Sequence, residues 1–255
     1  MYFGLCTISN LDVDAETVIR LAAEAGYSGV ELCGRDPHAA DRSAAHFRKL
    51  AACAAANDIE VPVYGSYLRP GTDAFEDELE RELSATNALG APLIRVWAGE
   101  QEYQNTTDEH WDRTVGDLET LAHAAADRGI EVTVERHAGT LTNTAEGAIR
   151  LVEAVDRENC LLNYQPNFDH SADEVVADVR ELAPISNHAH IQATAEPGVR
   201  DRCLLEAGYF DVGAVLVALA DADFDGYVAV EFVTDAVAYE TAIRRDLEYL
   251  ESVRP

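Results

Sequence analysis

Eight short apolar segments alternate with eight longer amphipathic segments, and this alternation constrains the fold more than any other feature of the sequence. The short segments predict β-strands at residues 2–7, 29–33, 60–64, 93–98, 131–135, 160–164, 186–191 and 227–232. Apolar side chains at helical spacing predict helices at residues 15–25, 43–57, 75–89, 108–128, 145–155, 172–182, 212–222 and 236–252. Short buried strands joined by helices pair in parallel through right-handed crossovers.

The number of these strand–helix units predicts the architecture. Eight units in 255 residues fit a single closed (β/α)8 TIM barrel better than an open doubly wound sheet. No Gly-x-Gly-x-x-Gly motif follows the first predicted strand, and no linker interrupts the chain, so we expect one domain over residues 1–255. The longest connection, residues 193–210, lies on the catalytic face of such a barrel, where we expect a lid or a substrate loop.

Capping-box spacing marks three of the predicted helix starts. In this pattern a side chain at the helix start and an acidic side chain three residues later satisfy each other's backbone amides. The pairs with this spacing are Thr106 with Glu109, Asn143 with Glu146, and Ser171 with Glu174.

Acidic residues dominate the charge of the chain, with 47 Asp and Glu against 19 Lys and Arg and a net charge of −28. Phosphate backbones and anionic lipid headgroups repel such a surface, so we expect neither a nucleic acid nor a membrane as partner. Lys49 is the only lysine. An acidic excess with almost no lysine is typical of proteins from salt-accumulating cells, because high salt screens the repulsion. The alternative is an ordinary acidic cytosolic protein.

The N-terminal sequence and the cysteines predict a cytoplasmic protein. The first residues lack the basic and apolar regions of a signal peptide, and no run reaches the roughly 20 apolar residues of a membrane-spanning helix. The five cysteines are an odd number without metal-type spacing, which fits a reducing compartment.

Polar side chains gather at the ends of the last four predicted strands. In a TIM barrel these ends converge on one site. The residues are Glu135 and His137 of the fifth strand, Gln165 after the sixth, His188 and His190 of the seventh, and Glu231 of the eighth. Glu135, Gln165, His190 and Glu231 offer oxygen and nitrogen donors, which suit Mn²⁺ or Mg²⁺ better than a thiolate-type zinc site.

Three segments resemble a known family. Residues 135–144, ERHAGTLTNT, are similar to its Glu-x-His-x-Gly segment, residues 29–32, GVEL, to its second strand, and residues 226–231, GYVAVE, to its closing strand. The chain resembles the xylose isomerase-like TIM-barrel superfamily, in the sugar phosphate isomerase/epimerase group, over essentially its whole length. That group includes ketohexose 3-epimerases, inosose dehydratases and hydroxypyruvate isomerases.

The resemblance implies a divalent metal on Glu135, Gln165, His190 and Glu231, with Glu135 and Glu231 as catalytic base and acid. Gln165 stands where the family has Asp, so we expect weaker metal binding or a different preferred ion. The family's His-x-x-Asp motif is also broken, because Ala193 follows His190 at that distance. Asp169 or His170 could replace the lost ligand from the loop.

Seven further residues are candidates for substrate contact, and five of them have a structural alternative. His137 could contact substrate or support the site from behind. His188 shares a strand face with His190, and Trp97 could form a pocket floor. Arg95 could join that floor or pair with a buried Glu, and Glu31 could bind a sugar hydroxyl or pair with Arg95. Loop residues Arg200 and Arg202 could hold an anionic group, or be surface charges.

These residues predict a metal-dependent sugar or sugar phosphate isomerase or epimerase that works through an enediolate. The first alternative is a dehydratase or lyase on a cyclitol or keto sugar, which begins with the same proton abstraction. A second is a non-catalytic, vestigial sugar-binding barrel, and a more remote third is an endonuclease IV-type repair enzyme. Many relatives are dimers or tetramers, so the resemblance is compatible with a homo-oligomer.

Overall fold

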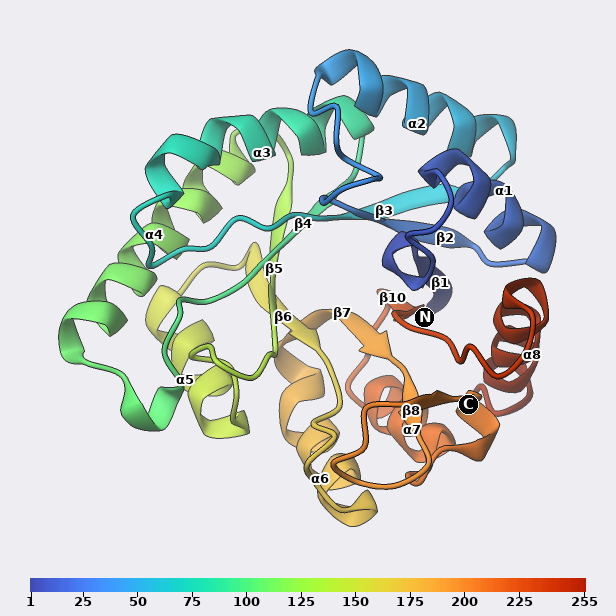
Figure 1. Cartoon of the computed structure of the whole chain (residues 1–255). Helices are drawn as coiled ribbons and strands as arrows, with labels where there is room; N and C mark the ends of the chain where they lie inside the picture. The colour runs from blue at the N-terminus through green and yellow to red at the C-terminus, as the bar shows by residue number, and fades with distance from the viewer.

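A closed barrel of eight parallel strands forms the centre of the computed structural model, which describes residues 1–255 (Figure 1). The strand order around the barrel is β1-β10-β7-β6-β5-β4-β3-β2, so neighbours in sequence are neighbours in space. The strands are β1 (Tyr2–Cys6), β2 (Gly29–Cys33), β3 (Glu60–Gly65), β4 (Leu93–Val96), β5 (Glu131–Glu135), β6 (Cys160–Tyr164), β7 (Ser186–Ile191) and β10 (Tyr227–Val230). The predicted TIM barrel is confirmed.

Eight α-helices surround the barrel, and α8 lies beside α1, which closes the ring (Figure 1). They are α1 (Ala15–Ala25), α2 (Ala44–Ala56), α3 (Phe75–Leu89), α4 (Asp108–Ala126), α5 (Ala145–Val155), α6 (Ala172–Leu182), α7 (Val212–Asp221) and α8 (Tyr239–Ser252). Apolar helix faces pack on the outward-facing strand residues in one continuous core. Short 3-10 helices occur at η1 (Thr7–Ser9), η2 (Tyr103–Asn105), η3 (Ala183–Ile185) and η4 (Leu205–Ala207).

Helix starts show where the sequence prediction was wrong. The predicted capping box of Ser171 with Glu174 is present in full. The other two predicted boxes are not formed, because the next residue in the chain takes the capping position. Thr107 caps α4 through the amide of His110, and Thr144 caps α5 through the amide of Gly147. Threonine follows the predicted cap in both places, and its hydroxyl bonds an amide three residues later equally well.

The long connection after β7 contains a small antiparallel hairpin, made of β8 (Ala193–Thr194) and β9 (Arg202–Cys203). Thr194 is opposite Arg202 in its register. This hairpin follows β7 with only Gln192 between them, so it lies at the carboxyl end of the barrel (Figure 1). The connection therefore contains a hairpin at the carboxyl end of the barrel, where a lid or substrate loop was expected.

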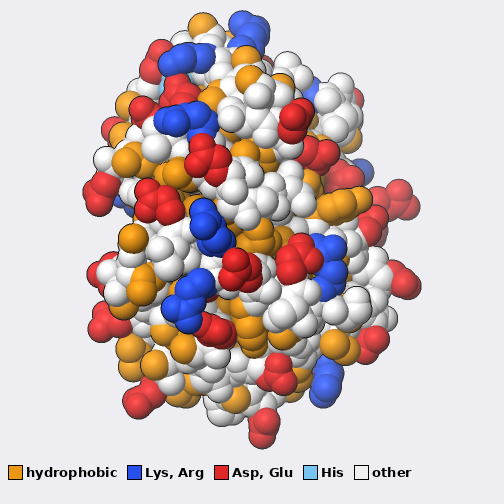
Figure 2. All heavy atoms as spheres, turned by 90° about the vertical axis from the view of Figure 1, so that its right-hand side faces the viewer, with side chains coloured by type: hydrophobic (Ala, Val, Ile, Leu, Met, Phe, Trp, Pro, Cys, Tyr) orange, Lys and Arg blue, Asp and Glu red, His pale blue; other side chains and the backbone are white.

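The outer surface carries the acidic excess. Figure 2 shows one face, where acidic side chains are scattered singly between hydrophobic and basic ones. No helix is both long enough and apolar enough to cross a bilayer.

Candidate active site

The barrel interior is polar at its carboxyl end. Strand register places Glu135 opposite Asn163, and Asn163 opposite His188. Arg95 lies opposite Thr133 of β5, and Glu31 lies opposite Cys6 of β1. Since side chains alternate along a strand, these residues all point inward while their apolar neighbours point to the helices.

Arg95 joins two buried carboxylates across the barrel. Its Nε donates to Oε1 of Glu31 at 2.8 Å, and its Nη1 donates to Oε2 of Glu135. Gly65 makes room for this contact, because a Cβ there would lie 2.5 Å from Oε1 of Glu31 and 2.7 Å from Nη2 of Arg95. Of the two alternatives for Arg95 and Glu31, the structure has the ion pair between them.

Only one carboxylate oxygen of Glu135 accepts hydrogen bonds. Oε2 accepts from Arg95 and, at 2.5 Å, from Nε1 of Trp97 just beyond β4, while Oε1 accepts no hydrogen bond. Burial opposes ionisation of Glu135, but Arg95 and His190 outweigh burial and hold its pKa below the ordinary value. Glu135 is therefore an ionised carboxylate with one oxygen free.

The two ring nitrogens of His190 have different neighbours: one contacts Glu31, and the other faces Gln165 and Glu231. Nε2 lies 2.7 Å from Oε2 of Glu31, and Nδ1 lies 3.2 Å from Oε1 of Gln165 and 3.9 Å from Oε1 of Glu231. Burial disfavours the charged ring, but Glu31 and Glu231 outweigh burial and raise its pKa to about 9. His188 contacts the same Oε2 of Glu31 at 2.9 Å, and burial lowers its pKa.

Glu231 follows β10 directly, and one of its oxygens is also engaged. Oε2 accepts from the amide of Gln192 at 2.6 Å. Burial raises the pKa of Glu231 to about 7; the nearby charge of Glu135 adds to this, and His190 opposes it. Gln192 follows β7 directly and was not among the predicted site residues, although its position two residues after His190 puts it on the same face as His188 and His190.

The donor set fits a divalent cation. Ligand atoms of Glu135, His190 and Glu231 lie within 4.8 Å of one another, and all three residues are buried. Glu135 and His190 each hold an outer partner with one atom and leave the other toward the site, as metal ligands do. Oxygen and nitrogen donors with three buried carboxylates nearby suit a hard or borderline ion. Gln165 could add its amide oxygen.

The two loop residues considered as replacement ligands lie elsewhere. His170 is 2.9 Å from Asp178 on α6, and Asp178 also pairs with Arg136. Asp169 is exposed and lines the cavity described next. Asp178 accounts for the orientation of His170, so neither residue is needed to explain the buried donor set.

A cavity of about 540 Å³ opens above this donor set. Its lining includes His137, Gln165, Gln192, Arg200 and Glu231, together with Arg136, Phe168, Arg202 and Phe232. Glu135 is not part of the lining. The sequence prediction missed Arg136, Phe168 and Phe232, because no spacing pattern marks them as residues of a site.

An aromatic wall stands beside the cavity. The rings of Trp97 and His137 stack at 4.8 Å, and Tyr67 meets Trp97 edge-on at 5.5 Å. The guanidinium of Arg69 lies over Trp97 at 4.4 Å. Trp97 therefore forms part of the wall and bonds Glu135 at the same time. The sequence prediction missed Tyr67 and Arg69, which follow β3.

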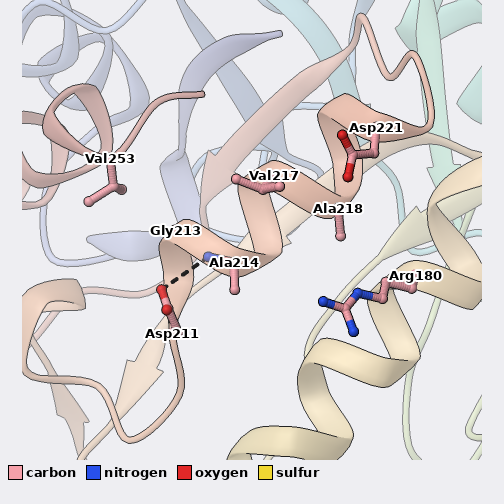
Figure 3. Close-up of a pocket in the computed structure, with 8 residues that line it drawn as sticks. All are labelled: Arg180, Asp211, Gly213, Ala214, Val217, Ala218, Asp221 and Val253. Carbon is pink, nitrogen blue, oxygen red and sulfur yellow. Dashed lines mark hydrogen bonds between the residues drawn. The ribbon is translucent and has the colours of Figure 1, made fainter.

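A second cavity, of about 410 Å³, lies outside the barrel between α6, α7 and the C-terminal segment (Figure 3). Figure 3 shows Arg180 of α6 across from Asp221 of α7. Asp211 is engaged as the cap of α7 through the amide of Ala214. The groups of possible metal ligands lie instead at the strand ends of the barrel.

The chain is similar in sequence to two dehydratases and in structure to a protein solved with a bound zinc atom. The chain is 26% identical over 205 residues to the 3-dehydroshikimate dehydratase of Bacillus anthracis, covering 75% of this chain and 71% of that protein. It is 24% identical over 208 residues to the inosose dehydratase of Yersinia enterocolitica, covering 70% and 68%. The solved structure of the IOLI protein with a bound zinc atom matches with a TM-score of 0.81 at 19% identity, covering 99% and 98%.

The family assignment follows from a match over most of the sequence. Residues 19–253 match the family described as "Xylose isomerase-like TIM barrel", and the strand order is that of a closed eight-stranded barrel. The chain belongs to the xylose isomerase-like TIM barrel family.

Proposed function

We propose that this protein is a divalent-metal-dependent dehydratase that removes a proton next to the carbonyl group of a cyclic hydroxy-ketone and expels a β-hydroxyl group as water. One observation carries the proposal: Glu135 and His190 each bind an outer partner with one atom and still offer a ligand atom within 4.8 Å of one of Glu231. A bound divalent ion at such a set polarises a carbonyl group and stabilises a neighbouring negative charge.

Glu135 and Glu231 have different surroundings, so we assign them different roles. Glu135 is tied down by Arg95 and Trp97 and does not line the cavity, so we assign it to holding the ion. Glu231 lines the cavity, and burial brings its pKa to about 7, close to the range in which a group both takes and gives protons. Glu231 therefore moves the proton, with Gln192 orienting the carboxylate.

The atoms balance with Glu231 alone. Its carboxylate takes the proton from the carbon next to the carbonyl group, and the electron pair of that C–H bond forms the new double bond. The β-carbon–oxygen bond breaks, the proton leaves with the hydroxyl as water, and Glu231 returns to its ionised form. His137, stacked on Trp97 at the cavity wall, is placed to contact a substrate hydroxyl.

Two observations favour the dehydratase over the isomerase or epimerase that the sequence analysis put first. Both curated relatives named above are dehydratases. Epimerisation also needs a second group to return the proton on the opposite face of the substrate, and Glu135 is not among the residues that line the cavity. A dehydratase, placed second by the sequence, is thus the better supported function.

The test is turnover of 3-dehydroshikimate and of inosose in D₂O with Mn²⁺, followed by proton NMR. A dehydrated product supports the proposal. Deuterium entering the substrate without loss of water supports an isomerase or epimerase instead. No exchange and no bound metal would favour a non-catalytic barrel, and cleavage of abasic DNA would favour the endonuclease. Glu231→Gln should lower kcat by about 10²–10⁴-fold, while the exposed Glu240→Gln should leave it unchanged.

A further inference from the structure

We propose that the cavity holds a carboxylate group of the substrate on Arg202, so that the substrate is an anionic hydroxy-ketone and not a neutral sugar. This inference rests on the proposed function, because the cavity above Glu231 is taken as the substrate site. The inference distinguishes between the substrates of the two dehydratase relatives, since 3-dehydroshikimate carries a carboxylate and an inosose carries no charge.

The hairpin fixes Arg202 in place over the strand ends. Arg202 lies on β9, opposite Thr194 of β8. Its guanidinium lies between two rings, 5.3 Å from that of Phe168 and 5.4 Å from that of Phe232. Its Nε donates to Oε1 of Gln192, and its Nη1 donates to the carbonyl of Arg200. The guanidinium is thus oriented before any ligand arrives, and Nη2 makes no hydrogen bond.

The position of Arg202 relative to Glu231 sets the length of the ligand. The amide of Gln192 bonds Arg202 with its oxygen and Glu231 with its nitrogen, so one amide group separates the two. Both line the same cavity. A six-membered ring whose reacting carbon faces Glu231 can therefore reach Arg202 with a substituent on the ring.

Arg202 pairs with no carboxylate, and what distinguishes it from the other unpaired arginines is its half-buried place in the cavity. Arg202 is half-buried, and its hydrogen bonds go only to an amide oxygen and a main-chain carbonyl. The positive charge of Arg202, hydrogen-bonded only to neutral groups, attracts into the cavity an anion that the surrounding acidic surface would otherwise repel.

A carboxylate fits this site better than a phosphate. A planar carboxylate pairs with one guanidinium edge, whereas phosphate sites use several donors, such as backbone amides at a helix N-terminus. The second arginine of the cavity, Arg200, is exposed. Glu102 and Asp169 also line the cavity, and their charges oppose a dianion more than a monoanion.

The catalytic test compares 3-dehydroshikimate with its neutral methyl ester on the Mn²⁺-loaded enzyme. We expect the acid to have at least a tenfold higher kcat/KM than the ester. Arg202→Gln should lower kcat/KM for the acid about 100-fold, mostly through KM, and change that for the ester little. Arg202→Lys keeps the charge but loses the planar guanidinium, so its kcat/KM for the acid should lie between those of the unaltered enzyme and Arg202→Gln. The exposed Arg48→Gln is the matched control. Equal loss on both substrates would overturn the proposal.

A binding measurement keeps the two proposals separable. By calorimetry, 3,4-dihydroxybenzoate, the aromatic acid that 3-dehydroshikimate leaves on losing water, should bind more tightly than catechol, and Arg202→Gln should abolish the difference. If no compound turns over but this difference is present, the proposed function fails and the carboxylate site stands. Equal binding of the two compounds, or inorganic phosphate binding more tightly on Arg202, would overturn the carboxylate site.

Discussion

The ring nitrogen Nε2 of His190 lies 2.7 Å from Oε2 of Glu31, which joins the seventh strand of the barrel to the second across the interior. The contact fixes the orientation of the ring and leaves Nδ1 toward Gln165 and Glu231. An outer carboxylate of this kind raises the basicity of a metal-binding imidazole. We therefore predict that Glu31 acts through His190 and not on the substrate.

Replacement of Glu31 tests this role. Glu31→Gln should weaken Mn²⁺ binding by about 10–100-fold, because the imidazole loses its charged partner. The measurement is calorimetric titration of the metal-free protein. The exposed Glu24→Gln on α1 is the control and should bind Mn²⁺ as the unaltered protein does. Unchanged affinity in Glu31→Gln would contradict the role of Nδ1 as a ligand.

The identity of residue 165 should set the strength of the metal site. Gln165→Asp adds a negative charge beside Nδ1 of His190, so we expect Mn²⁺ to bind roughly tenfold more tightly. Gln165→Asn keeps the group neutral and should not strengthen binding. Calorimetric titration of both variants with Mn²⁺ measures the difference. Equal Mn²⁺ affinities of the two variants would show that residue 165 is not a ligand.

Gly65 should be intolerant of any side chain. A Cβ at this position meets Oε1 of Glu31 and Nη2 of Arg95, so Gly65→Ala should lower the free energy of unfolding by about 1–3 kcal/mol. Gly116→Ala in α4 is the contrasting control, because a Cβ there meets nothing within 4 Å. That exposed helical position should gain about 1 kcal/mol. Urea unfolding of both variants measures the difference.

Asp246 makes the stability of the fold depend on pH. It is buried on α8, Oδ1 accepts from the amide of Leu205, and Oδ2 has no partner. Burial raises its pKa from 3.8 to about 6, so the folded protein holds this proton more tightly than the unfolded chain. The stabilisation is present below about pH 4 and is lost as the pH rises through 6.

Asp246→Asn should therefore stabilise the protein at pH 8, by at most about 3 kcal/mol. The gain should vanish near pH 4, where folded Asp246 already carries its proton. Urea unfolding at the two pH values measures it. The exposed Asp235→Asn should show no such dependence, and a gain of equal size at both pH values would contradict the assignment.

Salt adaptation stays a prediction of the sequence, and stability in KCl tests it. Raising KCl from 0.1 to 1 M shortens the screening length from about 10 to 3 Å, which should weaken repulsion among the 47 acidic residues. We expect the melting temperature to rise over this range. A melting temperature that falls or stays constant would favour the ordinary acidic protein.

The positions of the polar strand ends could be predicted from two patterns: the alternation of side chains along a strand and the repeat of strand–helix units. Alternation along a strand puts Glu135 on the inner face, and strand–helix counting closes the barrel, so the polar residues of separate strands must meet. The hydrogen bonds and ion pairs among these polar side chains could not be predicted, because no sequence pattern indicates which side chains pair. Arg95 could be assigned to a pocket floor or to an ion pair, and only the register opposite Thr133 decides between them.

The loops were less predictable than the barrel. Threonine follows both wrongly predicted caps, so a shift of one residue changes the cap without changing the pattern. The hairpin that carries Arg202 consists of two-residue strands, too short for any periodicity to reveal.

The hairpin of β8 and β9 pairs only with itself and shares no ladder with the barrel sheet. Its residues can therefore be exchanged without breaking any barrel hydrogen bond, while the ion pairs of Arg95 stay intact beneath. Selection could change which molecule enters by exchanging residues of this segment, provided that Arg202, which bonds the Gln192 amide that in turn bonds Glu231, is kept. Residues 194–201 are therefore a natural place to graft a new specificity onto this barrel.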